Sequence, residues 1–545
     1  MRSVFLKLGS VLFMAATFGA LAQAPSLEWT ATIDSGTTIS DGTRVIRRMN
    51  NGDIIAASQV NTGPTAIRVT RHNGATGAVL WTRDQAPGTI SNDTNDMVID
   101  PATGDAYLAS GVSVTGQGLN WYIYKVRGSD GVVQWSTSFN GPGTANDAPR
   151  SICLTSDGNV VVAGQYTLTT GAPSTRVAKY NASTGTQMWA FEPTTEWQDF
   201  FQVVADGAGN AITVGHVNAA SLATENGYVV KFNAGGTVVW SQSINGAAND
   251  FDGGLTVDVD SAGNVYAGVE SRVVPGMFVN DDDILVVKLA AATGVEQWRR
   301  SITGALVGSD LPSFITLDAS DNVYVGGAVY ESSAGNTDAL LAKLNSATGA
   351  VVWSITKAGT SGTGSELFRS IALNGSEVYA ASLMNNTVSA TAQNDIYIGR
   401  FNPASGATLW EINYNSSGTR NDQISSRRGG ALIAGATDTV FVAGQSQNPA
   451  ATQPDGVILK YAPAVVTPAA SIAVAPASVT EDGTSNLVYT VTLDSIVAIA
   501  TTVNITTTGG SGRLHRRRDN AEYSCQRCYC HNHHRPHRRR HGGSR

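Results

Sequence analysis

The residues whose types and spacing suggest metal chemistry lie near the C-terminal end of the chain. Cys525 and Cys528 have the Cys-x-x-Cys spacing with which many proteins bind zinc. His531, His533 and His534 follow closely, and imidazole nitrogens often complete such sites. A zinc cluster is therefore one interpretation of this tail.

The composition of the same tail supports two other interpretations. Residues 513–545 hold ten basic and two acidic residues, a net charge of +8, whereas the other 26 basic and 41 acidic residues give −15. Such a segment can act as a basic arm for a polyanion. Alternatively, it is translated out of frame: reading Tyr529 to His534 one base later gives only Thr, Ile, Ala or Val, a composition typical of β-strands. We favour the shifted frame and expect residues 513–545 to be disordered.

Few residues in the rest of the chain suggest catalysis. Cys153 lies in an apolar run, which predicts a buried thiol rather than a nucleophile. His72 and His216 have no evident acid–base partner, so we expect structural or solvated imidazoles. Residues 280–283 form an acidic segment, interpreted as a solvated loop with a weak cation site as the alternative. The sequence has no nucleophile elbow, no His-Glu-x-x-His and no phosphate loop.

The elements that would position these residues follow from an internal repeat. Tryptophan recurs every 51 to 58 residues, at positions 29, 81, 135, 189, 240, 298, 353 and 410. A glycine-containing turn precedes each later tryptophan, and a Lys or Arg lies nine or ten residues before it. Each repeat contains four short β-rich runs separated by Gly, Asp and Asn, which predicts four-stranded propeller blades and an all-β protein.

The order of the strands predicts the number of blades. The chain opens with a fourth strand around Trp29, continues through seven complete repeats, and ends with strands one to three at Tyr461. Pairing the two ends gives an eight-bladed β-propeller, residues 25–461, closed by its N-terminal strand. Closure removes exposed sheet edges.

Three residue series are expected to hold the blades together. The tryptophans should pack between adjacent blades, since a large aromatic side chain buries much area. Trp121 and Trp197 lie outside that series and could instead face a ligand or a partner. An acidic residue at the start of each first strand should accept turn amides, and the repeated Lys or Arg should pair with it or lie along the sheet. We assign this acidic series to Asp41, Asp96, Asp147, Asp199, Asp252, Asp310, Glu366 and Asp422.

Residues 318–327 and 338–345 resemble the repeats of secreted bacterial β-propeller proteins. The Gly-x-x-x-Trp endings of the repeats are similar to quinoprotein-type (PQQ-like) blades. The resemblance spans residues 25–461 and implies an architecture. Quinoprotein dehydrogenases carry an adjacent cysteine pair near their cofactor, and this region has Cys153 alone. No catalytic or cofactor-binding residue is therefore assigned.

A second domain is expected after a proline-containing linker, residues 462–470. Residues 471–512 resemble the first half of a Calx-β domain, an immunoglobulin-like β-sandwich that often binds Ca²⁺. The resemblance maps the family's early acidic ligand onto Glu481. The site would be incomplete, because Glu481 and Asp482 cannot supply the six to eight oxygens that Ca²⁺ takes.

Residues 1–24 are typical of a signal peptide, with a basic start, an apolar stretch and an Ala-Gln-Ala cleavage site. We therefore expect a secreted, periplasmic or cell-surface protein without a transmembrane segment. The sequence favours a non-enzymatic binding or surface-interaction protein whose partner is an extracellular protein or glycan, not a nucleic acid. The alternatives are a quinoprotein-like enzyme or assembly factor with a ligand in the central channel, and a carbohydrate-binding module.

Overall fold

The computed structural model consists of β-strands, and no residue that it describes is helical. It describes residues 24–463, 470–475, 488–493 and 530–533, with gaps at 38–39, 64, 90, 144, 195–197, 219–224, 275–280, 333–335, 362–363, 389–390, 417–420, 426–429 and 448–452. Contacts divide the chain into two units, Met1–Pro463 and Ala464–Arg545.

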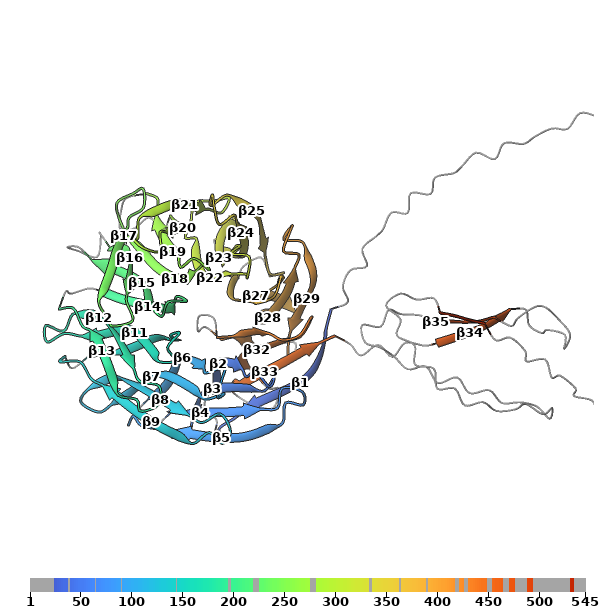
Figure 1. Ribbon diagram of the computed structural model, residues 1–545, viewed down its shortest axis with the longest axis horizontal. Coiled ribbons are helices and arrows are strands. Elements are labelled where there is room, and N and C mark those ends of the chain that lie inside the picture. Colours follow the sequence, from blue (N-terminus) through green and yellow to red (C-terminus); the bar gives the residue numbers. More distant parts are fainter. Residues whose placement is uncertain are drawn as a thin grey trace, which may run out of the picture. The chain divides into compact units, whose positions relative to one another are not determined.

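The first unit is a β-propeller with eight blades, arranged in a ring in Figure 1. Seven blades are consecutive four-stranded antiparallel sheets. Their strands are β2 (Gly42–Arg48), β3 (Ile54–Asn61), β4 (Thr65–His72) and β5 (Val79–Gln85) in blade 1; β6 (Asn92–Ile99), β7 (Ala106–Val114), β8 (Gly118–Val126) and β9 (Val133–Phe139) in blade 2; β10 (Ala148–Leu154), β11 (Val160–Thr167), β12 (Pro173–Tyr180) and β13 (Gln187–Phe191) in blade 3; β14 (Gln198–Ala205), β15 (Ala211–Asn218), β16 (Glu225–Phe232) and β17 (Val238–Ile244) in blade 4; β18 (Asp252–Val259), β19 (Val265–Arg272), β20 (Asp282–Leu289) and β21 (Glu296–Ile302) in blade 5; β22 (Leu311–Leu317), β23 (Val323–Ser332), β24 (Asn336–Leu344) and β25 (Val351–Lys357) in blade 6; and β26 (Leu367–Asn374), β27 (Glu377–Val388), β28 (Thr391–Phe401) and β29 (Thr408–Tyr414) in blade 7.

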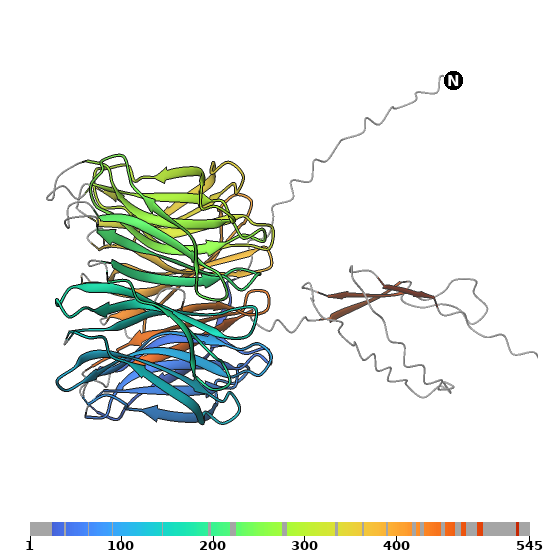
Figure 2. The same ribbon diagram turned by 60° about the vertical axis from the view of Figure 1, so that its left-hand side comes forward.

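Blade 8 joins the two ends of the ring. It comprises β30 (Asp422–Ile424), β31 (Leu432–Ala434), β32 (Val440–Ser446), β33 (Asp455–Ala462) and the N-terminal β1 (Ser26–Ile33). β1 runs antiparallel to β33, and Trp29 pairs with Lys460 in the register. The all-β class, the eight blades and the closure by the N-terminal strand are thus confirmed. Figure 2 shows the same propeller turned, so that its blades are seen from the side in overlapping layers.

The core lies between neighbouring blades. One cluster, for example, joins Val214 and Trp240 of blade 4 to Val257, Val269 and Val287 of blade 5. The second strands are almost completely buried, because a neighbouring blade covers each of their faces. Small and β-branched residues dominate these strands for the same reason.

The repeated tryptophans link one blade to the next, as predicted. Trp240 is 7% exposed, and its indole N–H donates to the Ala291 carbonyl of blade 5 at 3.1 Å. Gly294, in the same turn, packs against the indole with a φ of +69°, and a Cβ there would lie 2.6 Å from the ring. Only glycine combines this left-handed backbone with so close an approach. The same tryptophan–glycine contact joins the blades at Gly77, Gly131, Gly185, Gly236, Gly349 and Gly406.

The acidic series accepts backbone amides as predicted, with two corrections. Asp147 accepts the amides of Gly141 at 2.5 Å and Thr167 at 2.7 Å. Comparable backbone bonds occur at Asp41, Asp252, Asp310, Glu366 and Asp422. The assignment of Asp96 and Asp199 to this series was wrong. In blades 2 and 4 the register position of the acid is held by Asn92 and Gln198. The amide oxygen of Asn92 accepts the hydrogen bond that a carboxylate accepts in the other blades.

The repeated basic residues pair with other acids than expected. Lys231 binds Asp206 at 2.8 Å, and that carboxylate lies in the turn between the first and second strands. The equivalent pairs in other blades are Arg71–Asp53, Lys125–Asp105, Lys179–Asp157, Lys288–Asp260 and Arg400–Glu377. The prediction that they pair with the first-strand acid was wrong because backbone amides already occupy that carboxylate.

The second unit contains a small antiparallel sheet, β34 (Ala470–Ala475), β35 (Val488–Leu493) and β36 (Cys530–His533). β36 falls within the tail for which we predicted disorder. These four residues form a strand instead, because their backbone pairs with Val488–Val491 of β35. Glu481, Cys525, Cys528 and the signal segment lie outside the described residues.

A candidate ligand cavity among the innermost strands

A β-bulge shapes the inner surface of the ring. In blades 1 to 7 the register between the first and second strands shifts at the same place, so one extra residue bulges from the first strand. A bulge redirects the side chain of the extra residue. The bulged residues are Arg44, Asn95, Arg150, Phe201, Leu255, Ser313 and Arg369.

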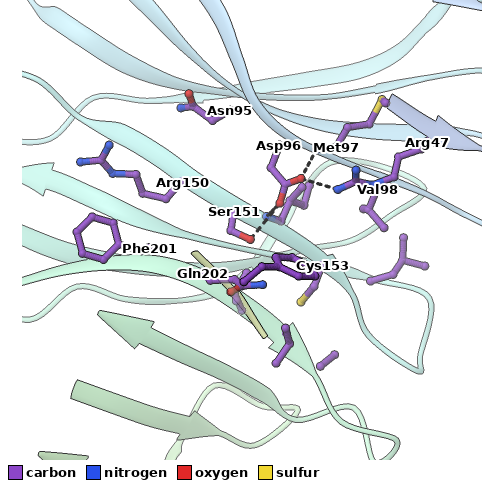
Figure 3. A pocket seen from close by; sticks show the side chains of 16 residues that line it. Arg47, Asn95, Asp96, Met97, Val98, Arg150, Ser151, Cys153, Phe201 and Gln202 are labelled. Carbon is purple, nitrogen blue, oxygen red and sulfur yellow. Dashed lines mark hydrogen bonds and ion pairs between the residues drawn. The ribbon is translucent and has the colours of Figure 1, made fainter. Parts of the chain in front are cut away.

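A cavity of about 550 Å³ lies among these first strands. Its wall comes mainly from β6, β10 and β14, with Arg47 of β2 and Phe314 of β22. Figure 3 shows the bulged Asn95, Arg150 and Phe201 among its lining side chains. A volume of this size suits a small ligand or an inserted side chain.

Asp96 is the acidic group of the cavity wall, and four donors hold it. Arg47 Nη2 lies 2.9 Å from Oδ1, which also accepts the Met97 amide at 2.8 Å. Ser151 Oγ and the Ile152 amide donate to Oδ2 at 3.0 and 3.1 Å. Burial raises the pKa of Asp96, and the Arg47 charge opposes that rise. This carboxylate is therefore fixed between blades 1, 2 and 3 (Figure 3).

Arg150 supplies positive charge beside an aromatic ring. Its Nη2 lies 2.8 Å from Asp199 Oδ2 in the next blade, and it also donates to Gln165 Oε1 at 3.2 Å. The guanidinium stands 5.7 Å from the centre of the Phe201 ring. The imidazole of His216 packs against that ring at a steep angle, with the two ring centres 5.2 Å apart. Burial, followed by the Arg150 charge, lowers the pKa of His216 to about 4, so the imidazole is neutral at pH 7.

Cys153 lies on the cavity wall and is half-buried rather than fully buried. Burial raises the pKa of its thiol to about 12, with the Asp96 charge acting in the same direction. A thiol protonated at neutral pH is a poor nucleophile. The cavity thus combines paired ions, an aromatic ring and an unreactive thiol, which suits non-covalent recognition.

The other singled-out residues lie outside this cavity. His72 is buried, with Thr70 Oγ1 2.9 Å from its Nε2, and burial lowers its pKa. Trp121 is completely buried against Arg176, so the expectation that it faces a ligand was wrong. Trp197 lies outside the described residues. Asp282 is buried and binds Arg272 at 3.0 Å, so this part of the acidic segment is not a solvated loop.

Closure of the ring also brings three carboxylates together. One oxygen from each of Asp34, Asp41 and Asp455 lies within 4.8 Å of the others. Burial, together with the charges of the other two, raises the pKa of Asp455. Sequence reasoning missed this group because Asp34 and Asp455 come from opposite ends of the chain.

The fold is an eight-bladed β-propeller. Three overlapping segments, residues 65–267, 173–395 and 225–475, match the family described as outer membrane protein assembly factor BamB. The chain belongs to this family. A comparison with curated proteins found no match.

Solved structures with a similar arrangement share little sequence. BamB from Moraxella catarrhalis is 13% identical, with a TM-score of 0.43, covering 81% of this chain and all of that one. The C-terminal WD40 domain of Sif2 is 9% identical, with a TM-score of 0.48, covering 80% of this chain and 98% of that one. The quinohemoprotein alcohol dehydrogenase from Comamonas testosteroni is 11% identical, with a TM-score of 0.44, covering 81% of this chain and 78% of that one.

The residues of the cavity do not fit a pyrroloquinoline quinone with a calcium ion. Among the described residues that line it, Asp96 is the one carboxylate, and four hydrogen bonds already occupy its oxygens. Calcium needs about six to eight oxygen ligands. Arg47 and Arg150, which could hold an anionic cofactor, are paired with Asp96 and Asp199.

No helix that could span a membrane is found in the described part of the chain.

Proposed function

We propose that this chain is a non-enzymatic binding scaffold that works outside the cytoplasm. The observation that carries the proposal is the engagement of Asp96 by four donors. A carboxylate held in this way stabilises the junction of three blades and is a poor general base or metal ligand. The protonated Cys153 thiol and the weakly basic His216, whose pKa is lowered to about 4, point in the same direction.

Family membership supports the same proposal, since the matching family is described as an assembly factor. The basic and apolar start of residues 1–24 supports export. The inner cavity is the place where we expect a partner segment or small ligand to bind. Arg150 and Phe201 would contact it, because the planar guanidinium and the aromatic ring lie together on the wall.

Site-specific photo-crosslinking tests the proposal. A photoreactive residue at Asn95, on the cavity wall, should give a discrete adduct in the extracytoplasmic fraction, and Arg150→Ala should weaken it. The same group at Arg299, on the outermost strand β21, serves as the matched control. Adducts that are identical from both positions, or unaffected by Arg150→Ala, would argue against recognition in the cavity.

Spectral titration tests the enzymatic alternative. Pyrroloquinoline quinone with Ca²⁺ should produce no saturable change in the absorbance spectrum. A saturable change that is lost in Arg47→Leu would overturn the non-enzymatic proposal. Binding on a glycan array that depends on Phe201 would instead favour the carbohydrate-binding alternative.

A further inference from the structure

Three of the bulged residues are arginines. Two of them, Arg44 and Arg150, have equivalent partners in their own blade and in the next blade. Arg44 Nε lies 3.1 Å from Asp93 Oδ1 in the next blade, and Arg150 Nη2 lies 2.8 Å from Asp199 Oδ2 in the next blade. Each acid stands two residues before the bulge of its own strand. Each arginine also donates to a glutamine of its own blade's second strand, Gln59 or Gln165.

Arg369 is the blade 7 counterpart of these two arginines. The register between β26 and β27 shifts between Phe368 and Ser370, which leaves Arg369 as the bulged residue. The position of the second-strand glutamine is taken here by Leu383, the register partner of Leu367. The position of the acid in the next blade is taken by Gln423, the register partner of Gln445.

The first replacement removes a hydrogen-bond acceptor, and the second removes the carboxylate that would neutralise the guanidinium. The Nε atom of Arg369 is buried and has no hydrogen-bond partner. Within the described chain no carboxylate forms an ion pair with Arg369, whose side chain is half-buried. Burial lowers the pKa of Arg369, consistent with a cation that has lost water without gaining an anion. A buried charge of this kind is costly unless it is paired.

The position that an acid holds in the other two blades, here Gln423, lies at a second cavity. Gln423 is exposed and lines a cavity of about 350 Å³ together with Asn421, Gln445, Gln447 and Gln453. Amide side chains can donate hydrogen bonds to an anion. None of these residues lines the cavity around Asp96, so the two sites are distinct.

The register places Arg369 and Gln423 as it places Arg44 with Asp93 and Arg150 with Asp199. From this equivalence we propose that Arg369, together with the amide-lined cavity at Gln423, binds the carboxylate of an external ligand. The ligand takes the place that Asp93 and Asp199 hold beside Arg44 and Arg150. A guanidinium recognises a carboxylate through paired hydrogen bonds, which gives the site geometric selectivity. A sugar acid and the C-terminus of a peptide both supply this group.

Isothermal titration of the full chain with defined probes tests the site. The first pair of probes is sodium glucuronate against glucose, and the second is acetyl-Gly-Gly against its C-terminal amide. We expect saturable binding of at least one carboxylate and none of its neutral match. The acid that binds, glucuronate or acetyl-Gly-Gly, identifies the kind of ligand that supplies the carboxylate. Failure of both acids, or equal heats with sodium sulfate at the same ionic strength, would overturn the proposal.

Two variants locate the binding. Arg369→Leu should weaken it at least tenfold, and Gln423→Asp should weaken it similarly while raising the melting temperature, because the new carboxylate pairs with Arg369 within the chain. Arg127→Leu is the matched control, since it removes the same charge from an exposed turn. Circular dichroism checks folding. If Gln423→Asp binds glucuronate and acetyl-Gly-Gly as the wild type does, or lowers the melting temperature, the proposed geometry is wrong.

Discussion

Asp258 lies on the first strand of blade 5 and accepts hydrogen bonds from the backbone amides of Val259 and Leu317, at 2.9 and 3.1 Å. Burial raises its pKa to about 6, well above the usual value for an aspartate. The folded state therefore binds a proton that the unfolded state releases between about pH 4 and pH 6, so this group makes the fold less stable as the pH rises through that window. At pH values above 7, ionised Asp258 lowers the free energy of unfolding by about 3 kcal/mol relative to low pH.

Chemical denaturation of the wild type and of Asp258→Asn at pH 4.5 and pH 7.5 measures this effect. The variant loses one acceptor, so it should be less stable at pH 4.5. At pH 7.5 the difference should shrink or reverse, because the wild type then carries the buried charge. Asp84→Asn, on an exposed residue of the edge strand β5, is the control. A difference between wild type and variant that is equal at the two pH values would contradict the raised pKa.

Cys153 offers a second test at the residue scale. With a pKa of about 12, its thiolate fraction at pH 8 is small, so iodoacetamide should modify it at least about 1,000-fold more slowly than an unperturbed thiol. The measurement uses a variant in which the three tail cysteines are serine, followed by mass spectrometry. Modification at the rate of a free thiol would show that the site is solvated and reactive.

Within the blades, the parts that sequence reasoning predicted are those that repeat in every unit. The Trp and Gly series were visible because each junction requires the same contact. The cavity was not visible, because it depends on a bulge that shifts the register by one residue. Asn92 illustrates the difficulty: it performs the acid's function as an amide, and Asp96 nearby looked like the missing acid.

The contact between Trp240 and Gly294 makes the junction of blades 4 and 5 testable. Trp240→Ala should lower the free energy of unfolding by about 3–5 kcal/mol, since it empties a buried site. Gly294→Ala should cost about 1–2 kcal/mol for its left-handed backbone and about 1–3 kcal/mol more for the contact with the ring. In the Trp240→Ala background only the backbone part should remain, so the double-mutant cycle should give a coupling of about 1–3 kcal/mol.

Gly158 provides the matched control for the backbone part. Its φ is +76°, and a Cβ there would meet no atom within 4 Å. Gly158→Ala should therefore lower the free energy of unfolding only by the cost of the left-handed backbone conformation. Additive effects of Trp240→Ala and Gly294→Ala in urea denaturation would contradict the proposed packing between blades.

At the scale of the whole molecule, the ring depends on one short strand from the other end of the chain. β1 covers the edge of β33, and Lys460 binds Glu28 of β1 at 2.7 Å. Ala31 of β1 also packs in a cluster with Ile458 of β33 and Ile46 of blade 1. Deleting residues 25–34 would expose the β33 edge and open the ring, so neighbouring blades would lose their mutual constraint.

We expect this deletion to lower the melting temperature by about 5–10 °C, as the loss of several kcal/mol implies, and to produce dimers or larger species through the free edge. Calorimetry and light scattering measure the two effects. Ala31→Asp should act in the same direction without removing the strand, and a peptide of residues 25–36 added to the deletion variant should restore the monomer by pairing with β33. Truncation after residue 463 removes the second unit and should leave the propeller transition unchanged. A deletion variant that stays monomeric and melts at the wild-type temperature would show that β1 does not maintain the ring.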